Sequence, residues 1–134
     1  MGADTSCVLL AEQHHGLAEG IRSLLGTKFE AVVMVADELS LAEAAERLRP
    51  GLVVVDISMA KGDVSGLMSR LRLRAPGLRV ILLSIHEEPT VAQSVFDAGA
   101  DGYLIKSSIA NELIPAVETV LKGKRYASSK ASPS

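Results

Sequence analysis

The sequence predicts an α/β protein built on a doubly wound sheet of five parallel strands, with helices on both faces. Two observations lead to this fold class. Short apolar runs alternate five times with segments whose apolar residues recur at helical spacing, which is typical of parallel sheets with right-handed helical crossovers. The chain has 134 residues, of which 48% are hydrophobic, and it shows no repeats or internal linker, which indicates one globular domain.

Each expected strand is a short run rich in β-branched or other apolar residues. The run that ends at Asp56 is apolar throughout and bounded by turn residues, as expected for a strand buried on both faces. The five expected strands cover residues 7–11, 29–35, 52–56, 78–83 and 103–105. The flavodoxin-like strand order 2-1-3-4-5 is expected for a fold of this kind.

The expected helices lie between and after these strands. Ser40 and Glu43 form a capping-box pattern, and glycine or proline follows the periodic segments. Helices are expected from the histidine pair 14–15 to Gly26, from Ser40 to Pro50, from Leu67 to Ala75, from His86 to Gly99, and from Ser107 or Ser108 to Gly123. We expect one domain over residues 5–126 and a disordered tail, rich in serine and lysine, over residues 127–134.

Composition argues against several classes of function. The formal net charge is −2 and aromatic residues make up 3% of the chain, so neither bulk attraction to nucleic acid nor base stacking is expected. Cys7 is the only cysteine, which excludes an internal disulfide and a multi-cysteine metal site. The sequence shows no signal peptide and no apolar run of membrane-spanning length, so we expect a cytoplasmic protein without a membrane partner.

Polar residues stand where four of the expected strands end. Glu12 and Gln13 follow the first strand, Asp56 ends the third, Ser84 the fourth and Lys106 the fifth. The carboxyl ends of parallel strands meet near the switch point of a doubly wound sheet, so we expect these side chains in one shallow site. Each residue alone has an ordinary explanation as a cap, turn or solvated residue. Their occurrence together favours a shared function.

This set of side chains suits phosphoryl transfer. Carboxylates hold a hard cation such as Mg²⁺, which offsets the charge of an incoming phosphoryl group. Asp56 is then the nucleophile and becomes an acyl phosphate. Ser84 donates a hydrogen bond to one phosphoryl oxygen, and Lys106 pairs with another.

With these residues in view, the sequence resembles the receiver domain of two-component response regulators, above all receivers that precede a LuxR-type helix-turn-helix domain. The resemblance runs from about Cys7 to Tyr126. It rests on Glu12-Gln13-His14, Val55-Asp56-Ile57-Ser58-Met59, Leu83-Ser84, the segment 98–106 and Gly123-Lys124-Arg125-Tyr126. It implies a phosphorelay receiver in which a histidine kinase or a phosphotransfer protein phosphorylates Asp56.

The resemblance also implies a switch. Phosphorylation draws Ser84 toward the phosphoryl group, and Tyr103 rotates inward into the space that opens. The face made by the expected helices 86–99 and 107–123 and by the strand 103–105 then changes its affinity for a downstream protein or a second copy of the chain.

The resemblance further implies a metal site and a slow off-reaction. The implied ligands of Mg²⁺ are Glu12, Gln13, the Asp56 carboxylate and the backbone carbonyl of Ser58. Ser58 and His86 flank the phosphorylated residue and are expected to tune the rate at which water removes the phosphoryl group. Apart from this self-dephosphorylation, no enzymatic activity is implied.

Two departures from the family pattern bear on the chemistry. Gln13 stands where the family has a metal-binding carboxylate, and an uncharged amide is expected to bind Mg²⁺ weakly. The loop 59–66 lacks the usual proline, is about two residues longer, and carries Lys61, which we interpret as solvated. These changes leave an alternative open: a pseudo-receiver that acts as a phosphorylation-independent interaction module because Glu12 and Gln13 alter its acidic pocket.

Three further hypotheses fit the residues less well. A cofactor binder of the flavodoxin type is disfavoured because Glu12 repels phosphate and no Ser/Thr/Gly-rich loop follows the first strand. A haloacid-dehalogenase-type phosphatase needs a second aspartate two residues after Asp56, and residue 58 is serine. A transition-metal site would use Glu12 and the histidines 14, 15 and 86. His14 and His15 are adjacent, however, and are better explained as exposed residues at a helix start.

Overall fold

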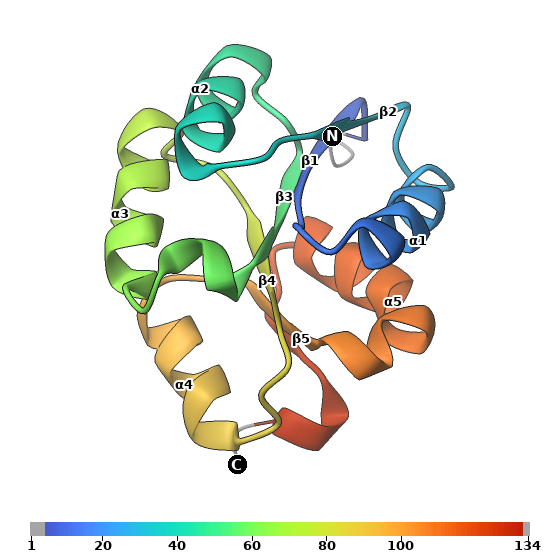
Figure 1. The fold of residues 1–134 in the computed structure, drawn as a ribbon, viewed down its shortest axis with the longest axis vertical. Coiled ribbons are helices and arrows are strands. Elements are labelled where there is room, and N and C mark those ends of the chain that lie inside the picture. Colours follow the sequence, from blue (N-terminus) through green and yellow to red (C-terminus); the bar gives the residue numbers. More distant parts are fainter. Residues whose placement is uncertain (1–4, 133–134) are drawn as a thin grey trace.

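A computed structural model of the chain describes residues 5–132 and shows one twisted sheet with helices packed on both faces (Figure 1). All strand pairs are parallel, in the order β2-β1-β3-β4-β5-β6. The strands are β1 (Cys7–Ala11), β2 (Ala31–Met34), β3 (Leu52–Asp56), β4 (Val80–Ser84), β5 (Gly102–Ile105) and β6 (Tyr126–Ala127). The helices are α1 (His15–Leu25), α2 (Glu38–Leu48), α3 (Val64–Arg74), α4 (Pro89–Asp97) and α5 (Ile109–Leu121). Three short 3-10 helices are η1 (Ile57–Ala60), η2 (Lys106–Ser108) and η3 (Ser129–Ala131).

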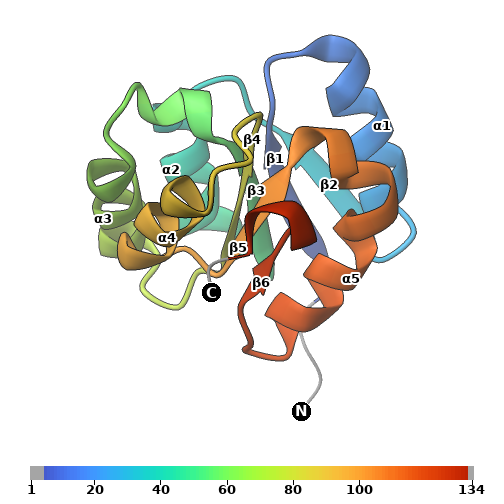
Figure 2. The same ribbon diagram turned by 90° about the horizontal axis from the view of Figure 1, so that it is seen from below.

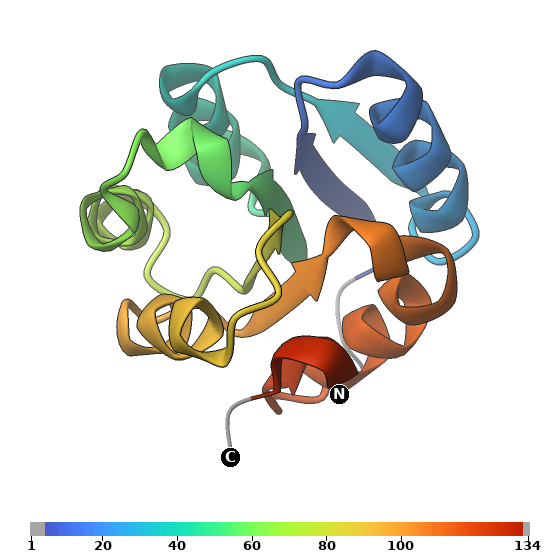
Figure 3. The same cartoon turned by 60° about the horizontal axis from the view of Figure 1, so that its bottom comes forward.

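The predicted α/β architecture with helices on both faces is confirmed. Helices α1 and α5 lie on one face of the sheet, and α2, α3 and α4 lie on the other (Figure 3). Successive residues of a strand point to opposite faces. In β3, accordingly, Val53 and Val55 join the apolar cluster that contains the α2–α4 residues, whereas Leu52 and Val54 join the cluster of α1 and α5. Every residue of β3 and β4 is buried, as expected for central strands of a parallel sheet.

The register of the strands places the polar strand ends at one edge of the sheet. Ala11 of β1 pairs with Val55, so Glu12 follows at the level of Asp56. Asp56 in turn pairs with Leu83, and Ser84 pairs with Ile105. The residues that directly follow β1 and β5 therefore lie beside the last residues of β3 and β4.

Three helices begin at other residues than the sequence pattern indicates. Helix α3 begins at Val64 and not at Leu67, because the Asp63 side chain caps it by accepting a 2.9 Å hydrogen bond from the Gly66 N–H. Helix α2 begins at Glu38, because the Asp37 side chain caps it by accepting a 2.8 Å hydrogen bond from the Ser40 N–H. Ser40 is therefore inside the helix and is not its cap. Helix α4 begins at Pro89 and not at His86. Proline is favoured in the first turn of a helix, where its missing N–H removes no hydrogen bond.

Two expectations, a sheet of five strands and a disordered tail from residue 127, are wrong for the residues that follow α5. Tyr126 and Ala127 form a sixth strand beside Gly102 and Tyr103 of β5, and Ser128 and Ala131 are fully buried. The outer edge of β5 offers backbone hydrogen-bonding groups, and this segment uses them although its sequence has no apolar periodicity. Residues 133 and 134 of the expected tail lie outside the described residues. Within residues 5–132, no helix has the length and apolar character needed to cross a bilayer.

Candidate functional site

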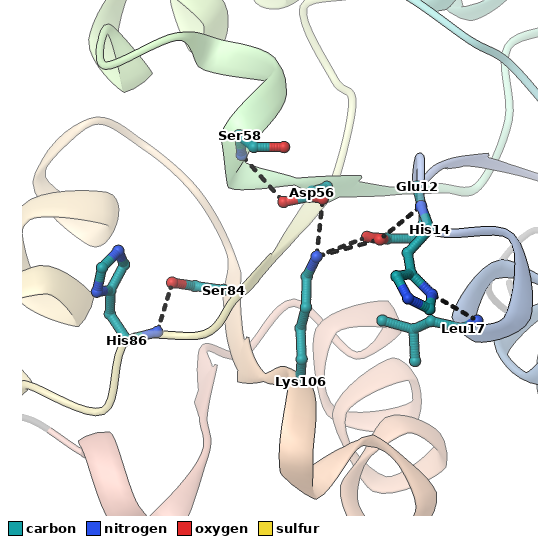
Figure 4. A network of polar contacts seen from close by, with 8 residues as sticks. All are labelled: Glu12, His14, Leu17, Asp56, Ser58, Ser84, His86 and Lys106. Atoms are coloured by element: carbon teal, nitrogen blue, oxygen red, sulfur yellow. Dashed lines mark hydrogen bonds and ion pairs between the residues drawn. The ribbon is translucent and has the colours of Figure 1, made fainter.

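Lys106 lies between two buried carboxylates at the carboxyl edge of the sheet (Figure 4). Its Nζ atom donates a 2.8 Å hydrogen bond to Oδ2 of Asp56 and a 3.1 Å bond to Oε2 of Glu12, and it lies 3.0 Å from Oε1 of Glu12. The side chain of Glu12 is 0% exposed, that of Asp56 8% and that of Lys106 19%. Charged groups this deeply buried are normally paired, and here one cation serves two anions.

The backbone fixes the orientation of the Asp56 carboxylate. Asp56 is the last residue of β3 and caps the 3-10 helix η1, so its Oδ1 atom accepts a 3.0 Å hydrogen bond from the Ser58 N–H. The other carboxylate oxygen receives Lys106. One oxygen is therefore held by the chain that follows β3, and the other faces the chain that follows β5.

The pKa shifts of these groups follow from burial and pairing. Burial acts to raise the pKa of Asp56, but the hydrogen bonds from Lys106 and Ser58 outweigh it and lower that pKa below its ordinary value. For Glu12, burial and the neighbouring Asp56 charge outweigh Lys106, and the pKa is raised. Burial opposes the charge of Lys106, yet its two carboxylate partners raise its pKa. Asp56 is consequently held ionised at neutral pH, as a nucleophile requires.

A second group of contacts joins the end of β4 to β5. Ser84 is fully buried, and its Oγ accepts a 3.0 Å hydrogen bond from the His86 N–H. The hydroxyl of Tyr103 donates a 2.7 Å bond to the His86 carbonyl. Tyr103 is 0% exposed, and burial raises the pKa of its hydroxyl. The ring thus lies inside the protein, in the inward position that the resemblance assigns to the switched form.

The residues expected to bind a cation are arranged unequally. Both oxygens of Glu12 face Lys106, whereas the side chain of Gln13 is exposed beside Val35 and Ala36. The Ser58 carbonyl accepts a 3.1 Å bond from the Lys61 N–H and keeps one free lone pair. Among the described residues, no three histidine, cysteine, aspartate or glutamate side chains cluster as a metal site. Oxygen donors for a hard cation are present, but few of them are charged.

The histidines do not assemble a transition-metal site in the described part of the chain. His14 caps α1, where its Nδ1 atom accepts a 3.4 Å hydrogen bond from the Leu17 N–H. His86 lies on the opposite side of Asp56 from His14 (Figure 4). His15 is exposed in the first turn of α1. The exposed helix-start explanation of His14 and His15 therefore agrees with the structure.

A cleft beside Asp56 includes residues that sequence reasoning did not single out. Its lining consists of Asp56, Ile57, Ser58, Gly62, Val64, Ile85, His86 and Lys106. Ile85 is 72% exposed although it is a large apolar residue. Its position directly after Ser84 was the only sequence signal, because an apolar residue in a loop carries no chemical signature. The cleft therefore borders Asp56 and has the apolar side chain of Ile85 in its lining.

The doubly wound sheet, with an ionised aspartate and a lysine paired at its carboxyl edge, defines the fold and site of a phosphoryl-accepting signalling domain. Residues 8–118 match the family described as the response regulator receiver domain. The chain belongs to this family, and it is a receiver domain of the two-component phosphorelay type.

Curated relatives and solved structures agree with this assignment. The chain is 31% identical over 127 residues to the transcriptional regulatory protein DegU of Brevibacillus brevis, covering 93% of this chain and 54% of that protein. It is 31% identical over 129 residues to the nitrate/nitrite response regulator protein NarP of Escherichia coli K12, covering 93% and 59%. A LuxR-family two-component response regulator from Aurantimonas sp. SI85-9A1 superposes with a TM-score of 0.85 at 27% identity, covering 96% and 93%. The chain spans little more than half the length of the curated relatives.

Proposed function

We propose that Asp56 accepts a phosphoryl group from the phosphohistidine of a histidine kinase or a phosphotransfer protein. An oxygen of the Asp56 carboxylate attacks phosphorus, the P–N bond of the donor breaks, and its electron pair stays on the histidine nitrogen. The observation that carries this proposal is the 2.8 Å pairing of Asp56 with Lys106 at the end of β3. The pairing keeps the carboxylate ionised and places a cation where phosphoryl charge accumulates.

In this proposal Lys106 and Ser84 stabilise the phosphorylated form. Lys106 donates one hydrogen bond to Asp56 and one to Glu12, so the third N–H of its ammonium group can be donated to a phosphoryl oxygen while the side chain stays in place. Ser84 ends the strand next to β3, and its oxygen accepts from the His86 N–H while its hydroxyl also interacts with the Tyr103 hydroxyl, so the hydroxyl hydrogen would have to turn toward a phosphoryl oxygen. A phosphoryl oxygen that recruits the Ser84 hydroxyl would therefore disturb the chain at His86.

Mg²⁺ is proposed as a weakly bound cofactor. Its donors would be the Asp56 carboxylate, the Gln13 amide oxygen and the Ser58 carbonyl, all of which are oxygen ligands that suit a hard cation. Both oxygens of Glu12 face Lys106, so Glu12 would add negative charge near the ion without ligating it. When bound, the ion offsets negative charge on the transferring phosphoryl group. Because the Gln13 amide is uncharged, Lys106 would offset a larger share of the negative charge on the phosphoryl group.

The proposed output is a change on the face formed by α4, β5 and α5. His86 links the two ends of the switch, since its N–H bonds Ser84 and its carbonyl bonds the Tyr103 hydroxyl. A downstream protein or a second copy of the chain would bind this face. Ser58 and His86 line the cleft beside Asp56 and would set the rate at which water hydrolyses the acyl phosphate. No observation favours the phosphorylation-independent alternative.

The proposal is tested by the intact mass of the protein after incubation with acetyl phosphate, with and without Mg²⁺. We expect one phosphoryl adduct, lost in Asp56→Asn and retained in Asp63→Asn, whose aspartate is exposed and caps α3. The adduct should form faster with Mg²⁺. An adduct that survives in Asp56→Asn would show that another residue is phosphorylated. Absence of any adduct, together with no response to beryllofluoride, would leave the pseudo-receiver alternative.

A further inference from the structure

The segment 126–131 lies along the outer edge of β5, between α4 and α5 (Figures 2 and 3). Ser128 joins it to β5 through two hydrogen bonds: its N–H donates to the Tyr103 carbonyl at 2.9 Å, and its Oγ accepts from the Ile105 N–H at 2.8 Å. Ser128 is 0% exposed. The segment is thus attached to the backbone of the proposed switch residue and of the residue that precedes Lys106.

The same segment covers the side of the sheet on which the Tyr103 ring lies. Tyr103 and Ala131 are both 0% exposed, and both belong to the apolar cluster that includes Phe96 of α4. Without the segment, β5 would be the last strand of the sheet. An outward rotation of the Tyr103 ring would take it out of the cluster that it shares with Ala131 of η3. The ring is therefore retained inside the protein while the segment is docked.

Three further contacts anchor the segment, or the residue directly before it, to the flanking helices. The Glu112 carboxylate of α5 accepts a 2.7 Å hydrogen bond from the Tyr126 hydroxyl and a 3.3 Å bond from the Ser129 N–H. On the other side, the Arg125 guanidinium lies 5.2 Å from the centre of the Phe96 ring. The segment is a short element at the edge of the sheet, and such elements open within the folded protein more readily than central strands, so docking and release are expected.

We propose that the segment 126–131 is a regulatory element that holds Tyr103 inward, so that docking of the segment and phosphoryl binding at Asp56 stabilise one another. This inference rests on the proposed function, in which phosphorylation favours the inward tyrosine. Since coupling between two sites is reciprocal, each event strengthens the other by the same factor. Release of the segment would free the outer edge of β5 and allow the ring to move out.

The hold on Tyr103 is tested by NMR of the whole chain labelled with ¹³C-tyrosine. The chain has two tyrosines, and Tyr126→Phe assigns their signals. We expect Ser128→Ala to shift and broaden the Tyr103 ring signals, because it removes the acceptor of the Ile105 N–H. Ala131→Asp, which places a carboxylate at a buried position, should act in the same way. Ser129→Ala is the matched control, since that serine is exposed and keeps its N–H.

The coupling is tested with beryllofluoride as the phosphoryl analogue. We expect Ser128→Ala to weaken its binding about fivefold, and we expect beryllofluoride to slow hydrogen exchange of the Ile105 amide in the unmodified chain by a similar factor. Unchanged Tyr103 signals in both variants would refute the inference that the segment keeps Tyr103 inward. An unchanged affinity for beryllofluoride in Ser128→Ala would refute the coupling between the segment and Asp56. If the unmodified chain takes neither beryllofluoride nor phosphate, the proposed function and the coupling fail together. The tyrosine signals would still decide whether the segment holds Tyr103.

Discussion

The Nζ atom of Lys106 lies 2.8 Å from Oδ2 of Asp56, and the same atom lies within 3.1 Å of both oxygens of Glu12. One lysine therefore pairs with both the proposed phosphoacceptor and the neighbouring Glu12 carboxylate, and its single positive charge balances one of their two negative charges. The arrangement links folding to function, because the cation that prepares Asp56 also offsets the repulsion of two buried anions.

Replacement of Lys106 should destabilise the fold. Lys106→Met keeps the apolar bulk of the side chain and removes its charge, which leaves Glu12 and Asp56 facing each other. We expect the free energy of unfolding at pH 7 to fall by about 1–3 kcal/mol, less than for a fully buried pair because Lys106 is partly exposed. Urea unfolding measures the change. Lys124→Met, at an exposed position, should stay within about 0.5 kcal/mol of the unmodified chain; equal effects of both variants would contradict the prediction.

A carboxylate at position 13 should strengthen cation binding. Gln13 is exposed at the end of β1, so Gln13→Asp adds a charged oxygen ligand without disturbing the core. We expect the affinity for Mg²⁺ to rise about tenfold, which corresponds to about 1.4 kcal/mol. The Mg²⁺ dependence of the phosphorylation rate gives this affinity. Gln93→Asp makes the same substitution on α4 and should leave the affinity for Mg²⁺ unaltered. An unchanged affinity in Gln13→Asp would show that position 13 does not contact the ion.

The Asp101 side chain should be important for stability and not for phosphoryl transfer. Its Oδ2 atom accepts a 2.9 Å hydrogen bond from the Val80 N–H at the start of β4 and a 3.1 Å bond from Arg72 of α3. Asp101→Ala leaves both donors without this acceptor, and we expect the free energy of unfolding to fall by about 1–3 kcal/mol.

Thermal and urea unfolding would measure the effect of Asp101→Ala. Asp97→Ala is its control, because Asp97 is exposed on α4 and its side chain accepts a hydrogen bond from the neighbouring Gln93 side chain. The rate of phosphorylation should be the same in both variants at temperatures where they are folded. A loss of phosphorylation without a loss of stability would refute this assignment.

Tyr126 should titrate at strongly alkaline pH. Burial and the Glu112 carboxylate raise its pKa from 10.0 to about 12. Since the folded-state pKa lies above the unfolded value, this contribution to stability is complete below pH 10 and is lost as the pH rises through about 12. Ultraviolet absorbance of phenolate follows the titration, and Tyr126→Phe identifies its step. Glu112→Gln should lower the pKa of Tyr126, whereas Glu118→Gln, which removes the partner of Lys28, should not.

Much of the candidate site could be predicted from the sequence because it sits at strand ends. Asp56 closes an apolar run, and Ser84 and Lys106 close two others, so chain order and the parallel sheet were enough to bring their backbones to one edge. The pairing of Lys106 with Glu12 was not predicted. Which of several nearby anions a long side chain contacts depends on packing that no local pattern records.

The sequence by itself determined the family, the alternation of strands and helices, and the edge of the sheet that carries the polar residues. Run length and periodicity are local properties, and they survive in the sequence without knowledge of the fold. Only the tertiary structure decided that residues 126–131 form a sixth strand and a buried turn. Their stability comes from the free backbone groups of β5 and from Glu112, as in the bond from the Ile105 N–H to Ser128, 23 residues away. Such partners exist only once the sheet has formed.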